Sequence, residues 1–365
     1  MTMANGWQKA YQELKDFIAW NPRIEIGESV ISIPEDLRLE FYRLFDMVRV
    51  AFVEEKFPLL LDGVTLLSES YFKVEQEVTE LLGLDSISVP GNLHKFLSNP
   101  KERLIEGVFD SLFDLLKGEV DFEVFEWQAS RELEGTFRGF YHSGYEKWVA
   151  LSLLKLLEPD TNFHITLDMP VPRQRIRHPP PLEGLAPSPE ESRHLSFEHQ
   201  PSPTFTVPDF IVRSTKLNGY VALRSGFVMP MAAADNASKK REWFSLNSVQ
   251  AFDPHVILLF VDDNPEDISL VADKDRICRP DLMIKCMVKK DWYQKADLEE
   301  VKLHHDTLKP KMGTYVIYGE TTPILESGRS DSNIYILTVG FDTSKLASVI
   351  STLEGKESCS FAAQQ

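Results

Sequence analysis

The chain has 365 residues, of which 43% are hydrophobic and 11% aromatic, so it can bury a sizeable core, and its length predicts two domains. Its three cysteines have no paired spacing, which excludes a disulfide framework, and its longest apolar runs are far shorter than a membrane span. A formal net charge of −17 excludes a surface that is basic throughout, and we expect a cytoplasmic protein without a membrane segment.

Apolar residues recur at three- and four-residue spacing through the first 140 residues, which predicts amphipathic helices. The expected helices cover residues 7–20, 36–56, 69–83, 91–98 and 101–117. Residues 1–140 contain 14 Lys and Arg against 26 Asp and Glu, a net charge of −12. This segment therefore forms an acidic helical module. Because its charge repels nucleic acid, we expect it to hold a protein partner or to shape the domain that follows.

A strongly apolar helix is predicted over residues 141–158, with Ser143 and Gly144 as cap residues. Apolar side chains cover most of its circumference, so the helix should be buried. Glu146 falls in the expected first turn. There the carboxylate would complement the positive end of the helix dipole, or it would face a functional site.

The composition changes after a predicted strand at residues 163–172. Ten of the 22 prolines fall between Pro170 and Pro208. Proline lacks the N–H group that a sheet needs and blocks helix interiors, so residues 170–207 should form an extended, irregular insertion. We expect this insertion within an α/β domain that spans residues 141–355, with a tail at 356–365.

Residues 281–289 alternate between apolar and polar side chains, as a strand with one buried face does. The opposite face carries Asp281, Lys285 and Lys289. A carboxylate can bind a divalent cation, and a neighbouring ammonium group can position a water molecule or a phosphate. A half-buried strand with a solvated face explains the same alternation without any chemistry.

A second Pro-Asp pair occurs at Asp209, within a predicted strand at residues 206–214. A strand at 219–227 that carries Arg224, a helix near 236–251 and a strand at 255–261 should follow. Alternation places Asp209, Ile211 and Arg213 on one face, so a salt bridge at a buried edge would explain Asp209 without a metal ion.

Short sequence motifs in both regions resemble those of the PD-(D/E)xK nucleases, in particular those of the nuclease subunits of modification-dependent restriction systems. The sequence RPDL at residues 279–282 precedes a strand, a polar helix and the apolar strand YVIYGE, while YEKW at 145–148 resembles the first core helix of the group. The resemblance implies a restriction-endonuclease-like mixed β-sheet flanked by helices, in an α/β or α+β protein. It also implies defence or repair chemistry on nucleic acid, with DNA preferred over RNA.

The same resemblance assigns catalytic roles. Asp281 and Glu146 would bind Mg²⁺ or Mn²⁺, and Lys285 or Lys289 would hold the attacking water or the scissile phosphate. A second assignment takes Asp209 as the first acid and places Arg224 in the D/E-x-K segment. The sequence does not choose between the two.

Both assignments depart from the family motif. In relatives written RPDLxIExK, the acid falls at Lys285 and the lysine at Met287, whereas in the second assignment Arg224-Ser225-Gly226 replaces D/E-x-K. The alternative to an active nuclease is therefore a catalytically inactive, nuclease-like scaffold or binding subunit that engages nucleic acid or a protein partner.

Overall fold

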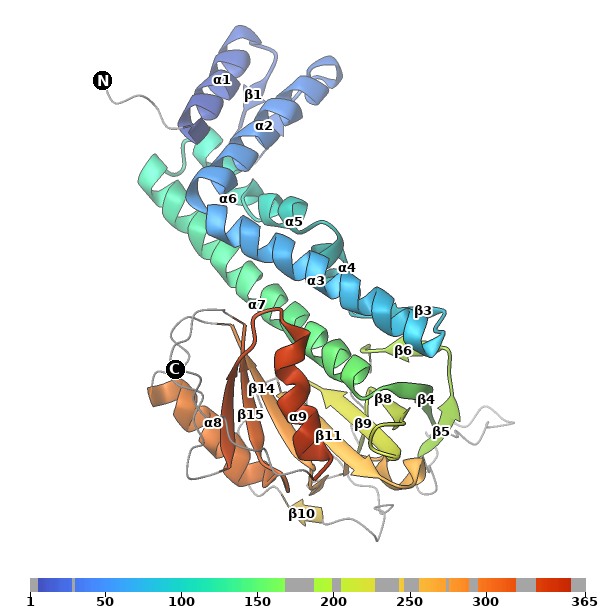
Figure 1. Ribbon diagram of the computed structural model, residues 1–365. Coiled ribbons are helices and arrows are strands. Elements are labelled where there is room, and N and C mark those ends of the chain that lie inside the picture. The colour runs from blue at the N-terminus through green and yellow to red at the C-terminus, as the bar shows by residue number, and fades with distance from the viewer. Residues whose placement is uncertain are drawn as a thin grey trace, which may run out of the picture. The chain divides into compact units, whose positions relative to one another are not determined.

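The computed structural model describes residues 6–27, 30–167, 187–198, 205–226, 243–245, 256–273, 276–288, 295–319 and 333–355. Helices and strands both build the fold, so the predicted mixed α+β class is confirmed (Figure 1). The largest sheet begins at Pro159, after the helical module predicted for residues 1–140. None of the helices in the described ranges combines the length and the apolar composition that a membrane span requires.

The chain divides into two compact units. The helical unit comprises Met1–Glu69 and Gly91–Tyr141, and the sheet unit comprises Ser70–Pro90 and His142–Gln365. Two long helices, α3 (Pro58–Leu82) and α7 (Phe122–Leu156), contribute residues to both units. Residues 70–90, which lie within the predicted N-terminal module, belong to the sheet unit.

The helical unit contains a core of aromatic rings. Its other elements are α1 (Gly6–Trp20), the hairpin of β1 (Glu25–Ile26) and β2 (Ile31–Ser32), α2 (Glu35–Lys56), α4 (Gly91–Ser98), α5 (Pro100–Glu106) and α6 (Phe109–Lys117). The ring of Trp7 lies 5.6 Å from that of Phe52 and 5.1 Å from that of Phe125, measured between centroids. These contacts join α1 to α2 and α7. The helical stretch predicted around residues 101–117 consists of two helices, α5 and α6, which are separated at Gly107, a residue type that weakens helices.

Helix α7 corrects the predicted helix at 141–158. It runs unbroken from Phe122, so Ser143 and Gly144 lie in its interior and do not cap it. The earlier start has a packing reason. Phe125, Ala129 and Leu133 recur at four-residue spacing and are all buried, which stabilises the helix upstream of residue 141.

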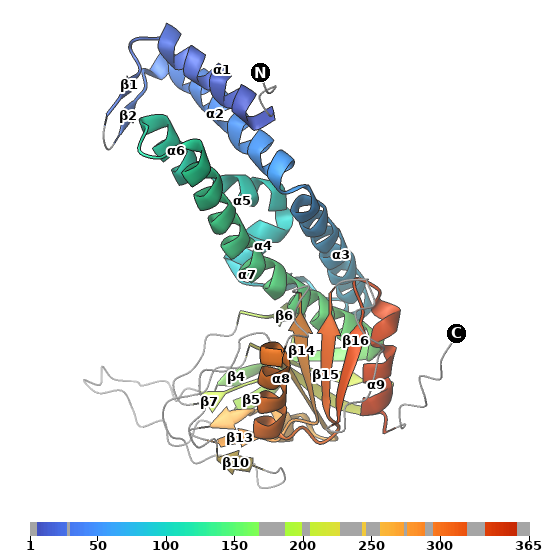
Figure 2. The ribbon, with the colours of Figure 1, turned by 90° about the vertical axis from the view of Figure 1, so that its left-hand side faces the viewer.

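The sheet unit is built on a mixed eight-stranded sheet (Figure 2). In spatial order the strands are β16 (Ile334–Thr338), β15 (Thr314–Tyr318), β14 (Leu282–Met287), β11 (Val256–Asp262), β9 (Gly219–Ser225), β8 (Phe210–Ser214), β4 (Pro159–Leu167) and β5 (Pro187–Glu191). β14, β15 and β16 are parallel, and every other neighbouring pair is antiparallel. Helix α8 (Lys295–Leu308) connects β14 to β15 as a crossover.

Helices cover both faces of the parallel part of this sheet. Val316 of β15 packs in a cluster with Val301 of α8. The adjacent Tyr315 points to the other face, where its hydroxyl contacts Ser348 and Thr352 of α9 (Ala347–Leu353). In Figure 1, α8 and α9 accordingly lie on opposite sides of β14 and β15. A strand between them is therefore buried on both faces.

Smaller elements complete the unit. They are the four-stranded sheet of β10 (Trp243–Ser245), β13 (Arg276–Cys278), β12 (Ala272–Asp273) and β7 (Phe205–Thr206), the pair of β3 (Ser86–Ser88) with β6 (His194–Ser196), and the short helices η1 (Pro265–Ile268) and η2 (Thr343–Leu346). Strand β10 contradicts the helix predicted near 236–251 at these three positions; the other positions of that prediction lie outside the described residues.

The proline-rich segment is more ordered than the sequence predicts. Within 170–207, β5, β6 and β7 are strands, while residues 170–186 and 199–204 lie outside the described part, as does the predicted tail at 356–365. Strand β5, with the sequence PSPEE, pairs with β4 at the edge of the eight-stranded sheet. An edge position tolerates proline because only one side of the strand must donate hydrogen bonds.

Candidate functional site

Strand β14 carries the first set of predicted site residues. All six residues from Leu282 to Met287 are buried, and so is Asp281 immediately before them. The expected solvated face is therefore wrong. The reason is the position of the strand: β14 lies between β11 and β15, and helices cover both faces.

The carboxylate of Asp281 contacts strand β11 and the loop before β15. Oδ2 accepts a hydrogen bond from the backbone N–H of Val261 at 2.7 Å, and Oδ1 accepts one from Nζ of Lys311 at 2.9 Å. The backbone of Asp281 is also engaged, since its N–H donates to the carbonyl of Leu259. These bonds connect β14 to β11 and to the loop before β15. The contacts of Asp281 are those of a residue that fixes the start of a central strand.

Lys285 lies on the same face of the chain as Asp281, but four residues away. At about 3.3 Å per residue, the two Cα atoms are separated by roughly 13 Å. Lys285 is only 2% exposed, and its Nζ lies 3.5 Å from Oε1 of Glu300 on α8. The structure thus brings Lys285 to an acid of α8 and not to Asp281. Lys289 lies outside the described residues.

Glu146 lies well inside α7 and is 1% exposed, so it does not complement a helix terminus. Its Oε1 accepts a hydrogen bond from Nζ of Lys147 at 2.9 Å. The same ammonium group donates to Oγ of Ser225 at 2.5 Å and lies 5.0 Å from the centre of the Phe197 ring. Glu146 therefore begins a buried polar network that reaches the end of β9.

Asp209 and Arg224 form the other half of this network. Nη1 of Arg224 donates to Oδ1 of Asp209 at 2.8 Å. Oδ2 of Asp209 accepts two hydrogen bonds from Ser225, one from its backbone N–H at 2.7 Å and one from its hydroxyl at 2.6 Å. Asp209 thus has a buried salt bridge, but its partner is Arg224, whereas Arg213, which alternation places on the same face, lies 3.8 Å from Asp160. Ser225 joins the two ion pairs into one chain of charged side chains at the ends of β8 and β9.

The sheet separates Glu146 from Asp281. Ser225, which contacts the partner of Glu146, pairs directly with Ile257, and Ile257 pairs directly with Ile284. Directly paired residues point to the same face, so Ser225 and Ile284 share a face. Asp281 and Lys285 are an odd number of residues from Ile284 and point to the opposite face. The two carboxylates predicted to hold one metal ion therefore lie on opposite faces of the sheet.

This arrangement does not fit the metal ion that the resemblance implies. A divalent cation needs several oxygen ligands around one point, whereas Asp281, Asp209 and Glu146 each contact a different cationic side chain. Within the ranges described, no three His, Cys, Asp or Glu side chains come together as a metal-binding group. We therefore derive no reaction step that uses a metal at these residues.

Lys147 and Ser225 are the network residues that sequence reasoning missed. A signal for Lys147 was present: it lies beside Glu146 in a mostly apolar stretch of α7, where the residues from Gly144 to Leu154 are all buried. A lysine in such a stretch needs a buried partner. Ser225 carried no comparable signal, because a serine at a strand end is usually solvated.

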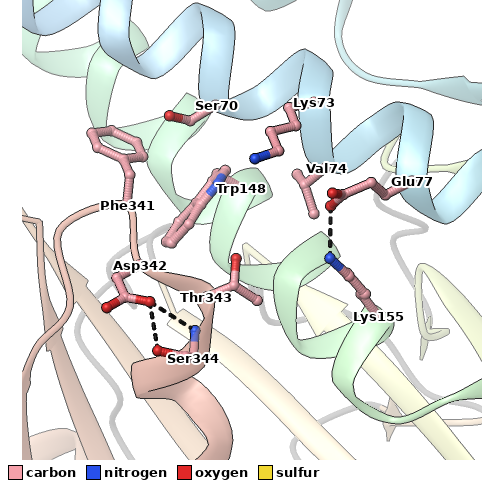
Figure 3. A pocket seen from close by; sticks show the side chains of 10 residues that line it. All are labelled: Ser70, Lys73, Val74, Glu77, Trp148, Lys155, Phe341, Asp342, Thr343 and Ser344. Carbon is pink, nitrogen blue, oxygen red and sulfur yellow. Dashed lines mark hydrogen bonds and ion pairs between the residues drawn. The ribbon is translucent and has the colours of Figure 1, made fainter.

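A separate cavity of about 320 Å³ lies in the sheet unit (Figure 3). Trp148 and Phe341, whose ring centroids are 5.1 Å apart, form its apolar side. Lys73 also lines it, and Lys155 pairs there with Glu77 at 2.9 Å. Hydrogen bonds from Ser344 lower the pKa of the Asp342 carboxyl, which caps the first turn of η2. None of the residues predicted for catalysis lines this cavity.

His305 on α8 gives the sheet unit an expected pH dependence. Burial lowers the pKa of His305, although nearby Asp306 opposes the shift, and Nδ1 lies 2.8 Å from the hydroxyl of Thr314. The unfolded chain thus binds the proton more tightly, and the stabilisation from His305 is lost as the pH falls through about 6.5.

His305→Gln should remove this contribution. We expect the urea midpoint of the wild type to fall more between pH 7.5 and 5.5 than that of the variant. His94→Gln, at an exposed position on α4, is the control and should behave as the wild type. Equal pH dependence in H305Q and wild type would contradict the assignment.

Comparison of the chain with protein-family models, with curated proteins and with solved structures finds no match.

Proposed function

We propose that this protein is a nuclease-like scaffold without catalytic activity, which binds a protein partner within nucleic-acid-processing machinery of defence or repair type. The observation that carries the proposal is the ion pair between Asp209 and Arg224. Where the resembling nucleases need a second acid, the chain has an arginine, and this guanidinium contacts the first acid at 2.8 Å. A cation fixed there takes the place that a metal ion would need.

The strand order supports a nuclease-like fold. β9, β11 and β14 form an antiparallel meander, and α8 then leads to β15, which is parallel to β14. This succession agrees with the strand, helix and strand that the RPDL resemblance implies, within a mixed sheet.

The charge around Asp281 supports a binding role without metal. Lys285, at the position of the second acid, is buried against Glu300, and Lys311 is paired with Asp281. These lysines are neutralised by acids and do not form a basic surface for phosphate groups. Together with the net charge of −17, this favours a protein partner over DNA or RNA.

A cleavage assay tests the proposal. With Mg²⁺ or Mn²⁺, we expect no cleavage of duplex, single-stranded or branched DNA, or of RNA, above the level of an Asp281→Asn preparation purified in parallel. Calorimetry should detect no difference in Mn²⁺ binding between wild type and D281N. Asp263→Asn, at an exposed position after β11, is the matched control. Divalent-dependent cleavage that D281N loses and D263N keeps would establish the nuclease instead.

A further inference from the structure

The helical unit has a groove between α1 and α2, and none of the residues predicted for catalysis lines it. The groove has a volume of about 510 Å³. Ala10 of α1 and Met47, Val50 and Ala51 of α2 form its apolar lining. The lining also includes three carboxylates and two cationic side chains, so a largely apolar floor has a polar margin. Grooves of this kind accept the apolar face of an amphipathic helix.

Two exposed apolar side chains extend the groove toward the tip of the helix pair. Trp20 at the end of α1 is 82% exposed and Leu39 on α2 is 86% exposed. The helices run antiparallel, side by side (Figures 1 and 2), and Trp7 contacts Phe52. Trp20 lies 13 residues after Trp7, and Leu39 lies 13 residues before Phe52. At 1.5 Å per residue, both therefore lie about 20 Å from that contact, at the same level.

Helical spacing places these side chains on the faces that line the groove. On α1, Glu13 lies three residues after Ala10, and Trp20 lies seven residues after Glu13. On α2, Asp46 lies seven residues after Leu39, and Val50 lies four residues after Asp46. The combined surface is about 20 Å long, which corresponds to nearly four helical turns. Tryptophan is the residue type that most often dominates a binding interface, and here it is almost fully exposed to water.

The charge of the helical unit indicates which kind of partner the groove binds. Residues 1–69 and 91–141 contain 13 Lys and Arg against 22 Asp and Glu, a net charge of −9. Such a surface repels nucleic acid and a second copy of itself, and it attracts a cationic partner. We infer that the α1–α2 groove, with Trp20 and Leu39 at its end, binds one amphipathic helix of a protein partner with lysine or arginine beside its apolar stripe.

This inference rests on the proposed scaffold role only in assuming a protein partner. The test uses the full-length chain and a fluorescein-labelled 18-residue peptide of leucine and lysine with leucines at helical spacing. A scrambled peptide of the same composition and a leucine–glutamate peptide are the comparisons. We expect the basic helical peptide to bind at least tenfold more tightly than either one. Hydrogen exchange should show protection in residues 6–20 and 35–54 when it binds.

Variants locate the binding. Trp20→Ala and Leu39→Ala should each weaken the peptide about tenfold, because alanine removes an anchor side chain without touching the core. Leu59→Ala is the matched control, since Leu59 is 78% exposed on α3 and does not line the groove. Equal affinity for the scrambled peptide, unchanged affinity in both anchor variants, or protection elsewhere would overturn the inference.

Sedimentation distinguishes a second copy as the occupant. A dimer that W20A dissociates would show that the groove binds this chain itself and would overturn the choice of a basic helix. None of these results depends on whether the protein cleaves nucleic acid, so the groove and the scaffold role can fail separately.

Discussion

Replacing Asp209 with alanine should lower the free energy of unfolding by about 3–5 kcal/mol, as expected when one partner of a buried ion pair is removed. The variant leaves Arg224 buried without its carboxylate and removes the acceptor of two hydrogen bonds from Ser225. Urea denaturation followed by circular dichroism measures the effect. If Asp209 instead bound a metal ion, the purified metal-free protein would change little.

Two further variants serve as controls for Asp209→Ala. Asp160→Ala breaks the exposed pair with Arg213, in which the charged atoms are 3.8 Å apart, and should cost less than about 1 kcal/mol. The double change Asp209→Leu with Arg224→Met removes both buried charges and should recover most of the lost stability. A loss for D209A no larger than that for D160A would show that the buried network does not hold the sheet together.

Changing Lys285 to glutamate should also destabilise the protein, by about 3–5 kcal/mol, because it buries a carboxylate in place of a paired cation. Glu300 on α8 has an oxygen 3.5 Å from the lysine ammonium, so the new carboxylate would meet a like charge. By the family motif alone, the same change restores an acid and strengthens metal binding. Chemical denaturation and Mn²⁺ calorimetry measured on one preparation separate these outcomes.

Two other variants show whether charge causes the loss at position 285. Lys285→Met keeps the length of the side chain without its charge and should cost less than K285E. Adding Glu300→Gln to K285E removes the like charge and should recover part of the stability. A K285E protein that is as stable as the wild type and binds Mn²⁺ more tightly would restore the Asp281 face as a metal site.

The order of secondary-structure elements could largely be predicted from the sequence, because apolar periodicity reports directly on which face of an element is buried. Apolar residues at three- and four-residue spacing predicted α1 and α2, and runs of apolar or alternating residues predicted β11 and β14. The start of α7 could not be predicted in this way, since Gly135 and Gly139 are of a residue type that weakens helices and Ser143 is of a type that often caps a helix start. Burial of the upstream stripe at Phe125 decides that the helix continues.

The candidate site was harder to predict than the fold. Alternation in β14 distinguishes two faces, but it does not reveal that α8 covers the polar one, because that depends on a crossover connection many residues downstream. Likewise, the sequence offers Glu146 and Asp281 as two acids with no sign that a sheet lies between them. Strand register supplies that information. The sequence thus identified acidic and basic residues that could carry chemistry, but only the three-dimensional structure shows which of them lie close together.

The two prolines of β5 limit how this protein can associate with copies of itself. The N–H of Ser192, just beyond β5, donates to the carbonyl of Asn162 on β4, so alternation directs the N–H groups of Ser188 and Glu190 the same way. At positions 187 and 189 a backbone N–H group would point outward from the sheet. Both residues are proline, which has no N–H group. An added strand would find no donor at these two positions. The edge formed by β5 is thereby protected against the strand-to-strand stacking that leads to aggregation.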